Sequence, residues 1–469
     1  MRAHPKIVVF DDDPTGSQTV HGCPLLLRFD RASLLEGLRD PSPLLFLLTD
    51  SRALGPQQAR LRVAAIAREL LAAAREAGLI GADQGGGAGW LLVSRGDSTL
   101  RGHFPLEAEA IAAELGPFQA TLLVPAFLEG GRTTVDGVHL LDGEPVHTTA
   151  FGRDRLFGFR NSDLPDWVEE KSGGQVPAAA VRRIGLAELE AAAEGEQGAH
   201  ALAQTLQNLR GNPFVVADAV RPRHLEALAA AVWAAQETGA HLMIQSAAGL
   251  IQALADLPPQ PLDTLGLAAL RRGPEPGAVL VGSHVPLADD QLAALLAEPE
   301  CEGVELPVER VLSNLRQARA PDDGLAAELL EAMQGLRRQG RTPVLFTSRG
   351  ERSCSDPAER RALGAALAEL MARTAAALPQ DLSFVISKGG ITTQTLLAEG
   401  LAASAVRLEG QLLPGLSMVR LPADHPHFPL LPLLTFPGNL GEAGTLAQAW
   451  RLMASAELEI ERTLPAGTT

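Results

Sequence analysis

The sequence contains no tyrosine, only three cysteines and only three lysines among its 469 residues. The cysteines (Cys23, Cys301 and Cys354) are far apart and form no CxxC pair. We therefore expect neither a disulfide framework nor a cysteine zinc site. The formal net charge is −16, whereas binding to a nucleic-acid backbone needs clustered Lys and Arg. We therefore expect no nucleic-acid partner.

Long apolar runs are also lacking. The stretch Phe428–Phe436 is cut by Pro429 and Pro432 and is much shorter than the roughly 20 residues that span a bilayer. The first residues contain no apolar segment followed by a small-residue cleavage site, so no signal peptide is expected. We expect a cytoplasmic protein without a membrane partner. The sequence leaves the oligomeric state open and is compatible with a homo-oligomer.

Short apolar runs alternate with helical Ala/Leu/Glu/Arg stretches in both halves of the chain, and 46% of all residues are hydrophobic. Such alternation indicates mostly parallel sheets covered on both faces. The fold predicted is α/β, with two lobes that each contain a mostly parallel sheet flanked by helices, and a ligand cleft between them. The proline-bounded stretch Leu257–Gly277 predicts a boundary between a substrate domain at 1–257 and a nucleotide domain at 276–469. The segment Asp142–Pro177 has little periodicity and is expected to be irregular. The strands are expected at Lys6–Phe10, Leu44–Leu48, Trp90–Val93, Thr121–Val124, Phe214–Val216, His241–Ile244, Ala278–Val281, Val344–Phe346 and Phe384–Ile386.

Ligands of open α/β sheets bind beyond the carboxyl ends of the strands, so the residues that follow each run matter most. In the first half these residues are carboxylates, hydroxyls and arginines, at Asp11–Gly16, Thr49–Arg52 and Ser94–His103. Because Arg binds carboxylates and Asp binds hydroxyls, this set suits a small polyhydroxylated anion. In the second half the turns are rich in Gly, Ser and Thr, which suits phosphate binding by backbone N–H groups. They are Gly282–His284, Thr347–Gly350, Ser387–Thr393 and Pro437–Gly441.

Two common nucleotide motifs are absent. No lysine follows a glycine, which excludes the GxxxxGK[ST] P-loop, and no GxGxxG opens a helix after a strand.

Several motifs, in order along nearly the whole chain, resemble the four-carbon acid sugar kinase family. They are FDDDPTGSQ, LTDSRAL, SRGDSTLRGH, PAFLEGGRTTVDGVHL, VADAVRP, GSH and SKGGITT. The resemblance implies an ATP-dependent kinase, with ATP and Mg²⁺ as cofactors, that phosphorylates the terminal hydroxyl of a threonate-like or erythronate-like acid. Its nucleotide contacts fall on Ser283, Gly389, Gly390, Ile391, Thr392 and Gly438. Its substrate motifs fall on Asp12, Asp13, Arg52, Asp97, Ser98 and Arg101.

A mechanism follows from these positions. Arg52 and Arg101 are predicted to hold the substrate carboxylate, and Lys388 to neutralise developing charge on the phosphates. Either Asp12 or Asp13 accepts the hydroxyl proton while the other is available to Mg²⁺. The metal ligands themselves stay unassigned.

Other interpretations are open at this point. The aspartates could cap a helix, both arginines could be structural ion-pair partners, and Lys388 could cap a helix. The order apolar strand then Asp11-x-Asp13-x-Thr15 also fits a haloacid-dehalogenase-type phosphatase, with Asp11 as nucleophile, Asp13 as acid/base and Lys388 as its lysine. Better-studied family members have an acidic residue at the position of Ile391, which motivates a third hypothesis, a non-catalytic sensor of sugar acid or nucleotide.

Overall fold

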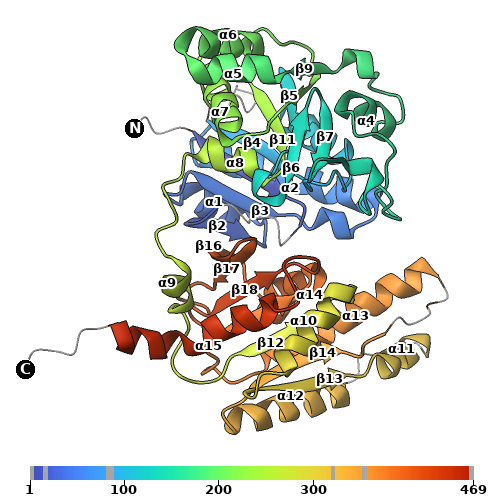
Figure 1. The fold of residues 1–469 in the computed structure, drawn as a ribbon, viewed down its shortest axis with the longest axis vertical. Helices are drawn as coiled ribbons and strands as arrows, with labels where there is room; N and C mark the ends of the chain where they lie inside the picture. The colour runs from blue at the N-terminus through green and yellow to red at the C-terminus, as the bar shows by residue number, and fades with distance from the viewer. Residues whose placement is uncertain are drawn as a thin grey trace, which may run out of the picture. The chain divides into compact units, whose positions relative to one another are not determined.

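The computed structural model describes residues 5–13, 20–80, 89–317, 323–350, 354 and 356–463. The chain divides into two compact units, Met1–Pro259 and Gln260–Thr469, which are termed unit 1 and unit 2 (Figure 1). Residues 14–16, which complete the predicted Asp11–Gly16 motif, lie outside the described ranges.

The sheet of unit 1 has the strand order β2-β3-β1-β4-β11-β5-β10-β9, and its neighbouring strands pair in parallel. Its central strands are apolar throughout because helices cover such a sheet from both sides; Val8, Val9 and Phe10 of β1 are all buried. The strands are β1 (Lys6–Asp11), β2 (Cys23–Leu26), β3 (Leu44–Leu48), β4 (Trp90–Arg95), β5 (Ala120–Val124), β9 (Arg182–Ile184), β10 (Phe214–Ala217) and β11 (Leu242–Ser246).

The helices of unit 1 form two groups, in which α1–α3 pack on one another and α5–α8 pack on one another. A small antiparallel sheet, β6 (Arg132–Val135), β7 (Val138–Leu141) and β8 (Glu144–Pro145), adds to the unit. The helices are α1 (Arg31–Arg39), α2 (Pro56–Glu76), α3 (Leu106–Leu115), α4 (Leu164–Lys171), α5 (Leu186–Glu194), α6 (Glu196–Gln207), α7 (Pro222–Glu237) and α8 (Ala248–Ala255). Single-turn 3₁₀ helices occur at Ser51–Ala53, Leu128–Gly130, Val146–Thr148 and Ala178–Ala180.

In unit 2 the strand order is β13-β14-β12-β15-β18-β17-β16. The strands from β13 to β18 in this order are parallel, and β17 is antiparallel to both of its neighbours. The strands are β12 (Ala278–Val281), β13 (Cys301–Leu306), β14 (Thr342–Thr347), β15 (Val385–Lys388), β16 (Ala405–Leu413), β17 (Leu416–Arg420) and β18 (Pro432–Phe436). The helices are α9 (Thr264–Ala268), α10 (Pro286–Leu296), α11 (Val308–Arg316), α12 (Asp323–Arg338), α13 (Pro357–Ala376), α14 (Gly390–Thr395), a π-helical turn at Leu396–Gly400, and α15 (Thr445–Thr463).

The predicted α/β class with mostly parallel strands is confirmed, whereas the predicted cleft between two lobes stays a prediction. One local expectation was wrong. The segment Asp142–Pro177 is not irregular throughout, because it contains α4, whose Asp163 caps the helix by accepting a hydrogen bond from Asp166 N at 3.3 Å. None of the helices in the described ranges has the length and apolarity that crossing a bilayer requires.

Candidate functional site

The charged residues of unit 1 gather where the strand order changes direction. From β1 the chain first builds β2 and β3 on one side and then crosses to β4 on the other side. In such sheets the loops that leave the two central strands diverge and open a crevice at their carboxyl ends. Asp11 and Asp12 stand at the end of β1, and Arg95 and Asp97 at the end of β4. The topology therefore brings the predicted substrate motifs to one place.

Arg52 is paired within this cluster by two carboxylates of the chain itself. Its Nε lies 2.9 Å from Asp12 Oδ2 and its Nη2 lies 2.6 Å from Asp12 Oδ1, which is a bidentate pair. Its Nη1 donates to Asp13 Oδ2 at 3.0 Å. Arg52 follows Asp50, which has a left-handed backbone with a φ of 48°. Arg52 thus orients the two aspartates, in addition to any contact with a substrate.

Arg95 is a second buried cation in the cluster, and sequence reasoning did not assign it a role. Its Nη1 lies 3.4 Å from both Asp11 Oδ1 and Asp12 Oδ1. Burial raises the pKa of Asp11 to about 7, although the charge of Arg95 lowers it. Oδ2 of Asp11 is buried and has no hydrogen-bond partner among the described residues.

Arg101 differs from Arg52 in the hydrogen bonds of its terminal guanidinium nitrogens. Its Nε donates to Asp97 Oδ2 at 2.7 Å and to Thr99 Oγ1 at 3.2 Å, and its guanidinium lies 4.8 Å from the Phe151 ring centroid. Within the described residues its two terminal nitrogens make no hydrogen bond. Burial disfavours the charged form of Asp97, but Arg52 and Arg101 outweigh it and hold the pKa of Asp97 below its ordinary value. Asp97 therefore positions Arg101 through Nε. The two terminal nitrogens of Arg101 can bind an anion.

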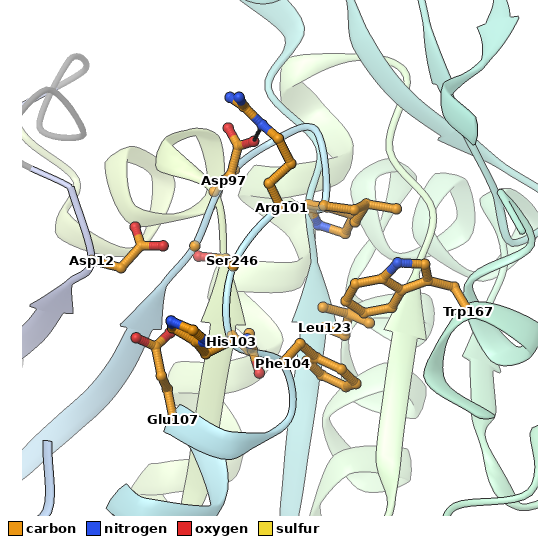
Figure 2. Close-up of a pocket in the computed structure, with 15 residues that line it drawn as sticks. Asp12, Asp97, Arg101, His103, Phe104, Glu107, Leu123, Trp167 and Ser246 are labelled. Carbon is orange, nitrogen blue, oxygen red and sulfur yellow. Dashed lines mark hydrogen bonds and ion pairs between the residues drawn. The ribbon is translucent and has the colours of Figure 1, made fainter. Parts of the chain in front are cut away.

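A small pocket with a volume of about 30 Å³ lies beside these residues. Asp12, Asp97 and Arg101 line it, whereas Arg52, Asp13 and Ser98 do not. Figure 2 shows Asp12 and Glu107 on one side and Trp167 on the other, with Ser246 between them. The remaining lining residues are Gly96, Leu100, Gly102, His103, Phe104, Leu123, Pro125, Gln245 and Ala247.

Ser98 does not line the pocket. It is buried, and its carbonyl oxygen is 2.8 Å from His139 Nε2. The other ring nitrogen of His139 is 3.0 Å from Thr134 Oγ1. Burial lowers the pKa of His139 to about 4, so this ring is neutral and acts as a fixed support for the loop.

Glu107 is a buried carboxyl group of the pocket that sequence reasoning missed. It lies in the first turn of α3 and is hydrogen-bonded by the hydroxyl of Ser51, which in turn is 2.9 Å from Thr49 Oγ1. Burial raises the pKa of Glu107 to about 8, and the nearby Asp12 carboxylate contributes to the rise. Glu107 is consequently protonated at neutral pH. It forms a hydrogen-bonded chain with the hydroxyl groups of Ser51 and Thr49.

This raised pKa gives a stability prediction. Because the pKa of Glu107 is about 8 in the folded chain and 4.5 ordinarily, the folded state binds the extra proton between these values. The contribution of this proton to the free energy of unfolding is fully present below about pH 4.5. It is lost as pH rises through about 8. We expect Glu107→Gln to reduce the fall in Tm between pH 5 and pH 8.5 by a few degrees, measured by scanning calorimetry. Glu109→Gln, an exposed neighbour on α3, is the control; curves for Glu107→Gln that run parallel to wild type would contradict the assignment.

In unit 2 the predicted nucleotide residues also come together. A Cβ on Gly438 would lie 2.7 Å from Ser283 Oγ, and one on Gly389 would lie 3.3 Å from Ser283 N. A Cβ on Gly282 would overlap Thr392 Oγ1. Gly389 has a φ of 119°, which an L side chain rarely adopts. The three turns thus form a tight cradle of small residues and backbone, as a phosphate group requires.

Gly390 and Ile391 complete this set. Gly390 starts α14, directly after the turn, and the Ile391 side chain is 55% exposed. Ile391 is therefore an exposed apolar residue in the first turn of α14.

Lys388 lies under the cradle. It is fully buried at the end of β15, and its Nζ donates to the carbonyl oxygens of Pro437 and Gly438 at 3.0 and 3.1 Å. Its ammonium group is 4.2 Å from the Phe436 ring centroid. Burial lowers the pKa of Lys388 to about 8, and Arg349 contributes to the shift. These contacts indicate that Lys388 positions the Pro437–Gly438 turn, while its action on phosphate charge stays a prediction.

The described residues contain no group of three His, Cys, Asp or Glu side chains arranged to hold a metal ion. Mg²⁺ does not need such a group, since it is commonly held by one or two carboxylates together with substrate phosphates. The cluster of Asp11, Asp12 and Asp13 offers oxygen ligands of the required kind.

Comparison with known proteins agrees with the two sites described in unit 1 and in unit 2. A model of a sugar-binding N-terminal domain matches residues 7–254, and a model of a nucleotide-binding C-terminal domain matches residues 278–446. A D-threonate kinase of Cupriavidus necator is 31% identical over 421 residues, which are 87% of this chain and 87% of that protein. The chain belongs to the four-carbon acid sugar kinase family. The family consists of ATP-dependent sugar acid kinases.

Further relatives agree with this assignment. A D-threonate kinase of Salmonella typhimurium is 27% identical, over 95% of this chain and 97% of the relative. A D-erythronate kinase of Heliobacterium modesticaldum is 28% identical over about half of each chain, 48% and 47%. A solved structure from Salmonella typhimurium has the same fold, with a TM-score of 0.65 and 20% identity over 95% of this chain and 99% of the other. A Haemophilus influenzae structure also shares it, with a TM-score of 0.60 and 15% identity over 96% and 100%.

Proposed function

We propose that the protein is an ATP-dependent kinase that phosphorylates the terminal hydroxyl of a four-carbon sugar acid of the threonate or erythronate type. One observation carries the proposal. Arg101, whose terminal nitrogens make no hydrogen bond among the described residues, and Asp12 line one pocket of unit 1, so this pocket offers a cation for an anionic group and a proton acceptor together. The family membership and the cradle of unit 2 support ATP as the second substrate.

In unit 1, Arg101 binds the substrate carboxylate with its terminal nitrogens. Arg52 and Arg95 stabilise the negative charge of Asp12 and fix its direction. Asp12, which lines the pocket, accepts the proton of the reacting hydroxyl. Asp13, which Arg52 holds at 3.0 Å, would contribute a carboxylate oxygen to Mg²⁺. Phosphoryl transfer depends mainly on positioning and charge stabilisation, which these contacts supply.

In unit 2, backbone N–H groups of Gly389–Thr392 and the Ser283 hydroxyl hold the ATP phosphates, with Gly438 leaving room beside Ser283. Lys388 keeps the Pro437–Gly438 turn in place through its two hydrogen bonds. Mg²⁺ would neutralise charge on the phosphates.

The test is a screen of four-carbon and five-carbon aldonates with ATP and Mg²⁺, scored by ADP release. We expect release only when a four-carbon acid is present. Binding of the acid without ADP release would favour a sensor, and phosphate release from a generic phosphoester without nucleotide would favour a phosphatase. Asp11, the nucleophile that a phosphatase would need, is 1% exposed and does not line the pocket.

Gly438→Ala tests the nucleotide cradle. The added methyl group would meet Ser283 Oγ at 2.7 Å, so the hydroxyl that is proposed to hold phosphate has to turn away or one of the two turns has to move. We expect the KM for ATP to rise about tenfold or more while the affinity for the acid is unchanged. Gly364→Ala is the matched control, because a Cβ there meets nothing within 4 Å. An unchanged KM for ATP in Gly438→Ala would remove this turn from the proposed site.

A further inference from the structure

Arg349 is a cation beside the nucleotide cradle of unit 2 that has no part in the mechanism described so far. It lies in the turn that follows β14, and β14 pairs with β12. Its Nη2 donates to the carbonyl oxygen of Ser283 at 2.8 Å. The N atom and hydroxyl of this same serine face Gly389 and Gly438 in the cradle. The guanidinium group is therefore in direct contact with a residue that is proposed to hold phosphate.

Further contacts fix Arg349 and the Ser283 turn in place. Nε of Arg349 donates to Asp289 Oδ1 at 2.5 Å, and Asp289 lies in the first turn of α10. Thr347 is the buried last residue of β14, and its hydroxyl is 2.9 Å from His284 Nε2. The turn after β12 is thus tied to the end of β14 at two successive residues, Ser283 and His284. The positive charge is held at a fixed place beside the cradle, which is the condition for preorganised stabilisation of an anion.

Lys388, the other cation near the cradle, is placed differently. It has no exposed surface, and its Nζ donates to two backbone carbonyl groups. A ligand therefore finds no atom of Lys388 to contact. The Arg349 side chain, by contrast, is 21% exposed. Of these two cations only Arg349 offers surface to a bound molecule.

The charges of Arg349 and Lys388 lie close enough to interact. Burial, and after it the charge of Arg349, lowers the pKa of Lys388. Among the described residues no carboxylate pairs with Lys388, and Asp289 pairs with Arg349. The two cations together thus carry one more charge than the Asp289 carboxylate balances, in a chain whose net charge is −16. A polyanion bound in the cradle offsets this local excess.

We propose that Arg349 supplies the charge that stabilises the nucleotide phosphates in unit 2. This inference rests on the proposed function for the identity of the nucleotide, and it assigns to Arg349 the role that the sequence predicted for Lys388. A charge interaction grows with the number of phosphate groups on the nucleotide, whereas a purely structural support affects every nucleotide alike. Arg349 therefore favours ATP over ADP and ADP over AMP.

The experiment measures the Kd of AMP, ADP and ATP by calorimetry on the full chain, in EDTA so that the phosphates keep their full charge. For Arg349→Met, we expect affinity to fall about 30-fold for ATP and less than about fivefold for AMP, with ADP in between. Arg349→Gln, whose amide can still donate to Ser283 O, should show the same order of losses. Arg349→Lys keeps the charge without the planar fork, so it should recover most of the loss for ATP.

Arg341→Met is the matched control. Arg341 directly precedes β14, donates to Pro299 O at 2.9 Å and pairs with Glu302, so it makes the same two kinds of contact as Arg349. It lies at the opposite end of β14, roughly 20 Å along the strand, where its charge is screened from the cradle. The three Kd values should therefore stay within about twofold of wild type.

The outcomes separate this inference from the proposed function. An equal loss for all three nucleotides in Arg349→Met and Arg349→Gln, or no loss, would refute the charge role of Arg349 while leaving the kinase proposal in place. Wild-type protein that binds no nucleotide would overturn the proposed function itself. Tm values of each variant identify any that fails to fold, and the remaining uncharged variant then carries the comparison.

Discussion

Replacing Arg101 by alanine is expected to lower kcat/KM for the acid by about 100-fold or more, while the KM for ATP stays within about twofold of wild type. The terminal nitrogens of Arg101 have no partner among the described residues, and its Nε is held by Asp97 and Thr99. The change therefore removes the carboxylate site without touching the cradle of unit 2. Steady-state kinetics with each substrate varied in turn give the two constants.

Two further variants sharpen this prediction. Arg101→Lys retains the charge but not the fork, so it should recover only part of the loss. Arg183→Ala removes an arginine of the same unit that pairs with Asp163 away from the pocket, and it should behave like wild type. If Arg101→Ala raised both KM values to the same extent, the assignment of acid and nucleotide to separate units would be incorrect.

Asp12→Asn is expected to lower kcat by about 10³-fold, because an amide cannot accept the hydroxyl proton. Asp13→Asn should act differently. It should raise the Mg²⁺ concentration needed for half-maximal rate and lower kcat much less, because Asp13 does not line the pocket. Rates measured across a range of Mg²⁺ concentrations separate the two roles.

The control for Asp12→Asn has to account for its ion pair with Arg52. Asp163→Asn breaks a comparable two-point contact, with Arg183 at 3.0 and 2.7 Å, outside the pocket. Tm values for both variants report the structural cost, and we expect only Asp12→Asn to lose activity. A kcat within tenfold of wild type in folded Asp12→Asn would exclude Asp12 as the proton acceptor.

The strands that the sequence predicted are those buried on both faces. Their apolar runs, such as Trp90–Val93 and Ala278–Val281, need no neighbour to be recognised. Of the strands that were missed, β2 and β18 are buried throughout but are short and contain a proline, whereas others carry polar residues on one side. In β16 buried and half-exposed residues alternate, and in β13 Glu302 and Glu305 interrupt the run. In a sequence with many helical stretches, a short alternation of apolar and polar residues is only a weak signal for a strand.

The site was predictable to the extent that it follows strands in the sequence. Asp12, Asp97 and Arg101 were found because they stand beyond strand ends, and they line one pocket. Gln245 also follows an apolar run, so the same rule could have indicated it. Glu107 and Trp167 could not be found in this way, because Glu107 lies in a helix and not beyond a strand end, and α4 lies in a segment without clear periodicity. Only the tertiary fold shows that they are buried at the pocket.

The most direct test of the kinase assignment is phosphorus NMR of the reaction of ATP, Mg²⁺ and the preferred tetronate. We predict ADP and an equal amount of a phosphomonoester whose signal is split by the two protons of a terminal CH₂ group. ATP hydrolysis to free phosphate with no such ester, or an ester on an internal carbon, would contradict the account.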